Sequence, residues 1–281
     1  MNRFIILKAK LGYNPHRDKK GRFASANSVS GKDSGLKKIG NPGKEPSDKE
    51  TKKIANVLGW NYNKEDEKDK LKKIDENPYY TSNPFEQTSF YDKTENDLSK
   101  ITGFSQEQVK LGLKQWRKTS NDSYAAINMQ KSASEEFGVP MSDYQKEKLN
   151  NYQGDNKKER SFGVKETPEN RDELISQERK LLRTMYNETQ KRLKDAGIDK
   201  VVVYRGFSSG ENLPKGQRTR LTSNTLESWT LNQDMAKTYQ NAVRMEVPVE
   251  RVLSSYVTGF GTAFESEVVV FGNSEDIGEV I

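Results

Sequence analysis

The segment FESEVVVF, residues 264–271, decides the fold that we expect for this chain. Its second half, VVVF, is a run of β-branched and aromatic residues, which is typical of a buried strand. Side chains two residues apart in a strand point to the same face, so Glu265 and Glu267 should share one space while Ser266 points away. Two like charges at the start of a core strand repel each other and lower stability, which suggests that they are kept for a function. Taken alone, the pattern is also that of a solvated strand end.

Two strand-like segments upstream add polar residues in a fixed order. The segment KVVVYRG, residues 200–206, carries Arg205 at its end, where an arginine is commonly a surface ion-pair partner. The segment LESWT, residues 226–230, places Ser228 and Thr230 on one strand face. Such a hydroxyl pair suits either a cleft or an ordinary amphipathic edge strand. The order aromatic-Arg, Ser-x-Thr, Glu-x-Glu is far more specific than any one of its parts.

This ordered set resembles the Arg-Ser-Glu class of mono-ADP-ribosyltransferases, the cholera-toxin-like clade of NAD-dependent toxins and phage effectors. The resemblance covers residues 200–272 well. It implies that Arg205 grips the NAD phosphates, with Gly206 allowing close backbone approach. It also implies that Glu267 stabilises the oxocarbenium-like cation formed as nicotinamide leaves, while Ser228 holds this carboxylate in place.

The same resemblance suggests how the acceptor is recognised. A glutamate two residues before the catalytic one, as Glu265 is, resembles the arginine-modifying members, because a carboxylate can pair with a guanidinium and help remove its proton. The loop 254–264 lies where the family has its acceptor-recognition turn. We expect Phe260 at its centre to be an exposed aromatic that docks a protein substrate, with a plain mobile hairpin as the alternative.

Further NAD contacts are expected upstream, where the resemblance is weaker. Tyr124 and Asn128 are one turn apart on a predicted helix that would border the nicotinamide site. Tyr239 lies near the family's nicotinamide-stacking aromatic and is equally compatible with the core. The expected NAD-binding set is Tyr124, Asn128, Tyr204, Arg205, Gly206, Ser228, Thr230 and Tyr239.

Missing residue types exclude several function classes. The only histidine is His16 and there is no cysteine, which excludes the diphtheria-toxin-like transferases, Ser-His-Asp hydrolases, cysteine nucleophiles and Cys/His metal sites. No loop has EF-hand spacing, so we expect no metal; a cation site built from carboxylates alone stays open as the alternative. No Walker-type or dinucleotide-fingerprint glycine motif is present either.

Charge and composition divide the chain. Residues 1–50 carry a net charge of +7 and the remaining 231 residues one of −1. We therefore expect a basic disordered tail over residues 1–50, a charged helical linker over 51–80 and a transferase domain over 81–281. The only apolar run of the tail, FIIL at residues 4–7, is too short for a signal peptide or a membrane span.

The order of predicted elements, helices first and strands later, indicates an α+β fold. Helices are expected over residues 105–116, 121–137, 142–152 and 170–196. The resemblance implies that such a helical layer packs on a two-sheet mixed β-core. The expected strands are 201–205, 218–221, 226–230, 243–247, 252–257, 265–271 and 278–281.

The resemblance implies transfer of ADP-ribose from NAD, as co-substrate, to arginine side chains of bacterial host proteins by a monomeric enzyme. Residues 14–25, NPHRDKKGRFAS, resemble a segment of bacteriophage head-associated proteins. We therefore expect action in the host cytoplasm after packaging in a virion, with the tail contacting nucleic acid or an acidic virion protein. The alternatives are a virion-associated structural or binding protein with an inactive transferase-like domain, and transfer to RNA, another non-protein acceptor or water.

Overall fold

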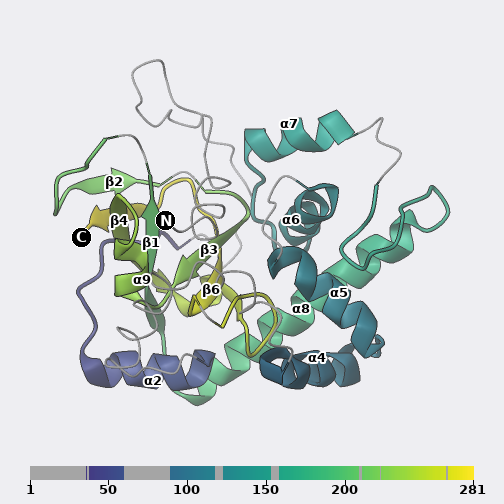
Figure 1. The fold of residues 1–281 in the computed structure, drawn as a ribbon, viewed down its shortest axis with the longest axis horizontal. Coiled ribbons are helices and arrows are strands. Elements are labelled where there is room, and N and C mark those ends of the chain that lie inside the picture. Colours follow the sequence, from purple (N-terminus) through teal and green to yellow (C-terminus); the bar gives the residue numbers. More distant parts are fainter. Residues whose placement is uncertain are drawn as a thin grey trace, which may run out of the picture.

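A computed structural model of the chain describes residue 36 and residues 38–59, 89–117, 123–152, 158–208, 211–221, 223–263 and 265–281. Most of the predicted tail and residues 60–80 of the predicted linker therefore lie outside the described residues. The described part is an α+β structure with seven α-helices and one antiparallel sheet of seven strands. Figure 1 shows the strands gathered at one end of the molecule and most helices at the other. The predicted α+β class is thus confirmed.

The helices are α2 (Asp48–Leu58), α4 (Ser89–Thr102), α5 (Gln106–Arg117), α6 (Tyr124–Phe137), α7 (Asp143–Asn151), α8 (Arg171–Asp195), α9 (Gln233–Lys237) and the short 3-10 helix η5 (Val249–Arg251). The strands are β1 (Lys200–Phe207), β2 (Arg218–Arg220), β3 (Leu226–Thr230), β4 (Asn241–Pro248), β5 (Val252–Ser255), β6 (Glu267–Phe271) and β7 (Ile277–Val280). Every predicted strand is found, with ends that shift by up to two residues.

Local sequence signals explain where several helices begin. Ser105 and Gln108 form a capping box, since each side chain binds the backbone N–H of the other residue. Asn232 caps α9 through its side-chain oxygen, which accepts from the N–H groups of Asp234 and Met235. Ser123 does the same for α6 by accepting from Ala126.

The sheet has the order β2-β7-β4-β1-β3-β6-β5, and every pairing in it is antiparallel. The predicted two-sheet mixed core is therefore wrong: strand patterns in the sequence do not encode which strands become neighbours. One feature divides the single sheet into halves. Strands β1 and β4 pair from end to end, whereas β1 and β3 pair at one position, Tyr204 with Thr230. We call this position the seam.

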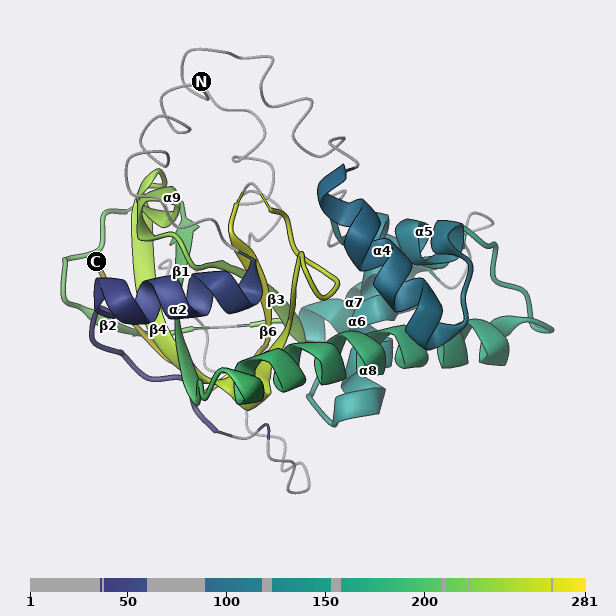
Figure 2. The same ribbon diagram turned by 90° about the horizontal axis from the view of Figure 1, so that it is seen from below.

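Strand β6 lies between two hydrophobic cores, and all five of its residues are buried. Val268 and Val270 belong to the core that also contains α2 and strands β1 and β4. Val269 and Phe271 belong to the core formed with α4, α5, α6 and α8. Burial on both faces is the physical reason for the continuous apolar run VVVF. Figure 2 shows α8 passing under both halves of the molecule, so this helix connects the two cores.

The N-terminal boundary predicted from charge is wrong, because residues 38–58 are part of the fold. Gly40 donates its N–H to Asp276 Oδ1 at 2.8 Å, and Asn41 forms a backbone bridge with Glu246. Asp276 is itself paired with the buried Arg251. Helix α2, placed in the tail and linker by its charge, buries Ile54, Ala55 and Leu58 in the core of the sheet. Its high charge reflects one solvated face, and its three buried apolar residues decide its packing.

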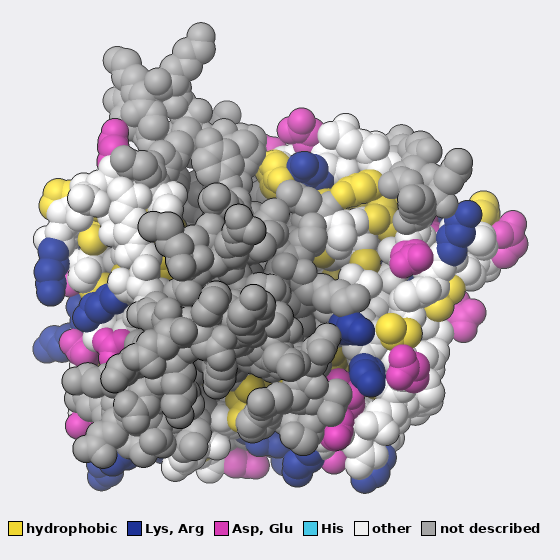
Figure 3. All heavy atoms as spheres, in the orientation of Figure 1, with side chains coloured by type: hydrophobic (Ala, Val, Ile, Leu, Met, Phe, Trp, Pro, Cys, Tyr) yellow, Lys and Arg dark blue, Asp and Glu magenta, His cyan; other side chains and the backbone are white. Residues whose placement is uncertain are grey.

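None of the helices in the described ranges is long and apolar enough to cross a membrane. Basic and acidic side chains are interspersed over the described part of the face drawn in Figure 3. This mixture agrees with the near-zero net charge of the chain after residue 50.

Leu58→Ala tests whether α2 belongs to the folded core. Leu58 is 1% exposed, so its truncation should lower the free energy of unfolding by about 2–5 kcal/mol, measured by chemical denaturation. Asn56→Ala, on the exposed face of the same helix, is the matched control and should change it by less than about 0.5 kcal/mol. Equal, small effects of both substitutions would show that α2 is an independent linker.

Candidate active site

The carboxylate of Glu267 is the centre of the candidate site. Glu267 is the first residue of β6 and is 1% exposed. Its Oε1 accepts hydrogen bonds from Ser228 Oγ at 2.5 Å and Trp116 Nε1 at 3.0 Å, and its Oε2 accepts from the backbone N–H of Thr262 at 2.8 Å. Burying a carboxylate is costly unless its oxygens are satisfied, and donors from three separate elements meet that need. The predicted Glu267–Ser228 contact is confirmed.

Ser228 reaches Glu267 because β3 and β6 are paired in register. Thr230 lies opposite Glu267, and Ser228 lies opposite Val269. Ser228 and Thr230 therefore share the face of Glu267, as alternation along the strand predicts. Thr230 Oγ1 donates to the backbone oxygen of Glu265 at 2.6 Å, which fixes the turn before β6.

Glu265 lies in that turn, two residues before β6 begins, and not in the strand as predicted. The backbone turns at Ser266, which has a positive φ of 51° and is buried. The two glutamates nevertheless meet, although strand alternation is not the reason. Thr262 Oγ1 donates to Glu265 Oε2 at 2.8 Å while Thr262 N–H binds Glu267, so one buried residue holds both carboxylates.

Arg205 is not brought to Glu267. Its guanidinium forms an ion pair with Glu227, which is 4% exposed, and lies 5.9 Å from the ring centre of Trp229. Glu227 and Trp229 alternate with Ser228 along β3, so Arg205 is associated with the opposite strand face. The predicted arginine and serine thus lie close to the seam but on different sides of the sheet.

Tyr204 and Gly206 serve packing in this structure. Tyr204 is 3% exposed and packs in a small core with Ala236 and Ala242. A Cβ atom on Gly206 would lie 2.0 Å from Cδ2 of Tyr239 and 2.5 Å from the backbone oxygen of Ala236. Gly206 therefore makes room for α9 and the half-buried Tyr239. This packing explains the glycine without the close approach of NAD that the resemblance implies.

Tyr124 and Asn128 belong to a polar network in the helical layer. The side chain of Asn128 donates to the backbone oxygen of Tyr124 at 3.0 Å, and Asn128 is 4% exposed. Burial, followed by a hydrogen bond to Glu166, raises the pKa of Tyr124. Burial acts against the charge of Glu166, but hydrogen bonds from Arg171 and Tyr124 and the charge of Arg160 outweigh it and lower its pKa. No described contact joins Tyr124 or Asn128 to Glu267.

The prediction that Phe260 is exposed is wrong. Phe260 is 0% exposed and stacks on Trp116, with ring centres 5.1 Å apart and planes inclined by 12°. The loop folds back onto α8 because Gly259 lacks a side chain: a Cβ there would lie 2.1 Å from the sulfur of Met185. Thr189 on α8 also donates to Thr258 at 2.7 Å. Phe260 is therefore a core residue that orients Trp116.

Four contributors to the site were not predicted as such. Trp116 lies in the helix predicted over residues 105–116 but was given no role in the site, since a 151-residue separation from Glu267 leaves no local signal. Glu227 is adjacent in sequence to Ser228, and Thr262 lies in the predicted loop 254–264; these positions were the available signal. Gln130 of α6 binds both the N–H and the carbonyl oxygen of Leu226 and so fixes the start of β3 against the helical layer.

No group of three or more histidine, cysteine, aspartate or glutamate residues that could hold a metal ion occurs in the described ranges. Comparison with known proteins adds no assignment: no family model, no curated protein and no solved structure matches this chain.

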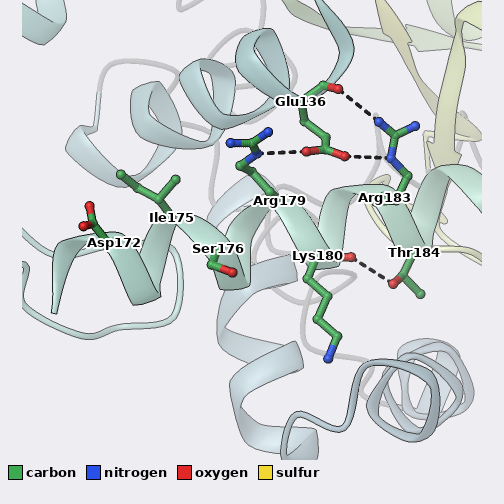
Figure 4. A pocket seen from close by; sticks show the side chains of 8 residues that line it. All are labelled: Glu136, Asp172, Ile175, Ser176, Arg179, Lys180, Arg183 and Thr184. Atoms are coloured by element: carbon green, nitrogen blue, oxygen red, sulfur yellow. Dashed lines mark hydrogen bonds and ion pairs between the residues drawn. The ribbon is translucent and has the colours of Figure 1, made fainter.

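A separate pocket of about 550 Å³ lies on α8 and is lined by none of the residues that surround Glu267. Figure 4 shows Arg179 and Arg183 converging on Glu136. Glu136 lies in the last turn of α6. Glu136 accepts from Arg179 Nε at 2.8 Å and from Arg183 Nε at 2.7 Å, and Arg183 also covers the ring of Phe137. Burial acts against the charge of Glu136, but the two arginines outweigh it and lower its pKa. In this pocket the charge of Glu136 is therefore neutralised by ion pairs that join α6 to α8.

Glu136→Gln should lower the free energy of unfolding by about 1–2 kcal/mol near pH 7, because it removes charge from two hydrogen bonds. A carboxylate whose pKa is lowered by folding contributes stability above its ordinary value of 4.5, and this stability is lost as the pH falls through the lower folded value. The difference from wild type should therefore shrink on acidification, measured by denaturation at a series of pH values.

Glu135→Gln is the matched control, since Glu135 is exposed on the same helix and pairs with Lys131 at 3.5 Å. It should change stability by less than about 0.5 kcal/mol. A pH-independent effect of Glu136→Gln would contradict the role given to its charge.

Proposed function

We propose that the chain is an NAD-dependent mono-ADP-ribosyltransferase that modifies arginine side chains. In this reaction the bond between nicotinamide and ribose C1′ breaks, and nicotinamide leaves with the bonding electrons. A guanidino nitrogen of the acceptor then attacks C1′ and releases a proton. The products are ADP-ribosyl-arginine, nicotinamide and one proton.

The observation that carries the proposal is the fixed carboxylate of Glu267, held at 2.5 Å by the hydroxyl of Ser228. Positive charge develops on the ribose as nicotinamide leaves, and a carboxylate held in advance at that point stabilises it without reorganisation. Ser228 and the other donors restrain the side chain of Glu267 by hydrogen bonds, and not by packing alone.

Glu265 suits the role of acceptor base in the proposed reaction. Its carboxylate is half-buried and shares Thr262 with Glu267, so the two carboxylates have a common anchor. A carboxylate close to the reacting ribose can bind an arginine side chain by charge-assisted hydrogen bonds and take up its proton.

Arg205 would bind the diphosphate of NAD. It is ion-paired with Glu227, and a guanidinium has five N–H donors, so contact with a phosphate is compatible with keeping that pair. Contacts of Tyr204, Gly206, Thr230, Tyr124, Asn128 and Tyr239 with NAD, as expected from the family resemblance, remain part of the proposal.

A second candidate is a binding or structural protein with a transferase-like domain that is inactive. Two observations favour it: Glu267 is 1% exposed, and Arg205 is paired with Glu227 on the other face of β3. RNA or another non-protein acceptor, or water, would be the alternatives within the enzyme class. The proposed setting is the cytoplasm of a bacterial host, reached from a virion, with a host protein as acceptor.

Glu267→Gln should lower transfer of labelled ADP-ribose from NAD to proteins of a bacterial lysate by at least about a hundredfold, because it removes the charge at the ribose. The amide group must also face at least one of the three donors around Glu267, so stability should fall by about 1–3 kcal/mol. Transfer is measured on purified protein, with mass spectrometry of the modified residues and circular dichroism to verify folding.

Glu178→Gln is the control for burial of an amide in place of a carboxylate, since Glu178 is 0% exposed and binds Arg160 and Ser132 in the helical layer. It should reduce stability while leaving the turnover of the folded fraction close to wild type. Wild-type turnover by a folded Glu267→Gln variant would sink the proposal.

Glu265→Gln separates cleavage of NAD from transfer. If Glu265 handles the acceptor, the variant should lose arginine modification by about a hundredfold while slow hydrolysis of NAD continues. Nicotinamide release and protein labelling are measured in the same reaction. Loss of both activities to the same extent would place Glu265 in the NAD site instead.

A further inference from the structure

Trp116 is a candidate positioning residue that lies outside the motif strands and to which the family resemblance assigns no role. It lies in the last turn of α5, in the helical layer, whereas Glu267 lies in the sheet. Its indole Nε1 donates to Glu267 Oε1 at 3.0 Å. The indole nitrogen can only donate a hydrogen bond, so its partner must be an acceptor, such as an unprotonated carboxylate oxygen.

The indole is itself held in place from two sides. Phe260 stacks on it at 5.1 Å with nearly parallel planes, and Phe260 is completely buried. The backbone oxygen of Phe260 accepts from Ser254 Oγ at 3.1 Å, which ties this ring to β5. Leu113 and Val109, one and two turns earlier on α5, are 0% exposed and anchor the helix in the core. The direction of the Nε1–H bond is therefore determined by packing.

Ser228 and Trp116 donate to the same oxygen from opposite layers of the molecule. Ser228 comes from β3 and Trp116 from α5, while Thr262 N–H binds the second oxygen from the turn. Two donors on Oε1 restrict rotation of the carboxylate about its terminal torsion, which is otherwise broad. Loss of either donor would leave this torsion less restrained.

From this geometry we propose that Trp116 positions the carboxylate of Glu267 for the cleavage of NAD. The proposal rests on the proposed function of Glu267 and adds a residue from the helical layer to it. Trp116 acts through Glu267 and needs no contact with the substrate. Hydrogen-bond partners that orient the ligands of a metal site are worth about 10–100-fold in activity, and we expect an effect of similar size for a partner that orients Glu267.

Trp116→Phe tests the proposal, because phenylalanine keeps an aromatic ring against Phe260 and removes the N–H donor. In NAD cleavage by the full chain, kcat should fall about 10–100-fold while KM for NAD changes by less than about threefold.

The double variant Ser228→Ala/Trp116→Phe should lower kcat by less than the product of the two single effects, since both donors act on one oxygen. Leu58→Ala, which removes packing from α2 and leaves α5 unchanged, should lower thermal stability but not the kcat of the folded protein.

A spectroscopic measurement tests the contact independently of activity. The chain has three tryptophans, and the indole N–H signal absent from the nuclear magnetic resonance spectrum of Trp116→Phe identifies Trp116. In Glu267→Gln this signal should move, because its acceptor loses charge. A signal that stays in place overturns the proposal.

The activity measurements separate this proposal from the proposed function. If wild type cleaves NAD and Trp116→Phe retains the wild-type kcat, the role of Trp116 is overturned and the proposed function stands. If wild type cleaves no NAD, the proposed function is overturned together with the role of Trp116.

Discussion

The arrangement of the sheet, the turn and the helical layer depends on one constraint: the carboxylate of Glu267 is buried at the beginning of a strand that has a core on each face. A buried carboxylate without partners would destabilise the fold by several kcal/mol. Its donors come from β3, from the turn before β6 and from α5. Satisfying this one group therefore ties together three parts of the molecule that are far apart in sequence.

The same principle governs the other side of the seam. Glu227 is as well buried as many core residues, and it is balanced by Arg205 and by the backbone N–H of Asn224. Because β3 alternates its side chains, Glu227 and Ser228 carry acidic and hydroxyl groups to opposite faces within two residues. The short pairing of β1 with β3 lies at this point. Polar residues thus concentrate where the ladder of the sheet is least continuous.

Local patterns predicted the elements of this structure, and long-range packing decided what they do. The run VVVF predicted a buried strand correctly because burial on two faces needs only apolar residues. The family resemblance, and not strand alternation alone, matched Ser228 to Glu267, and the contact forms because β3 and β6 pair in register. Phe260 was wrongly expected at the surface, because its burial depends on Gly259 accepting Met185 from a distant helix. Helix α2 was assigned to the tail and linker for the same kind of reason: its charge is visible in the sequence, but the core that accepts Leu58 is not.

The two charged halves of the candidate site differ in what a substrate would require of them. The described donors to Glu267 are all neutral groups: a hydroxyl, an indole N–H and a backbone N–H. Arg205 has an ionic partner, and turning it fully toward a phosphate would leave the charge of Glu227 buried without a cation. An arrangement in which Arg205 bridges Glu227 and a phosphate avoids that cost, because the guanidinium offers donors in more than one direction. In the proposed enzyme, Glu227 would therefore orient Arg205 toward the diphosphate rather than compete with it.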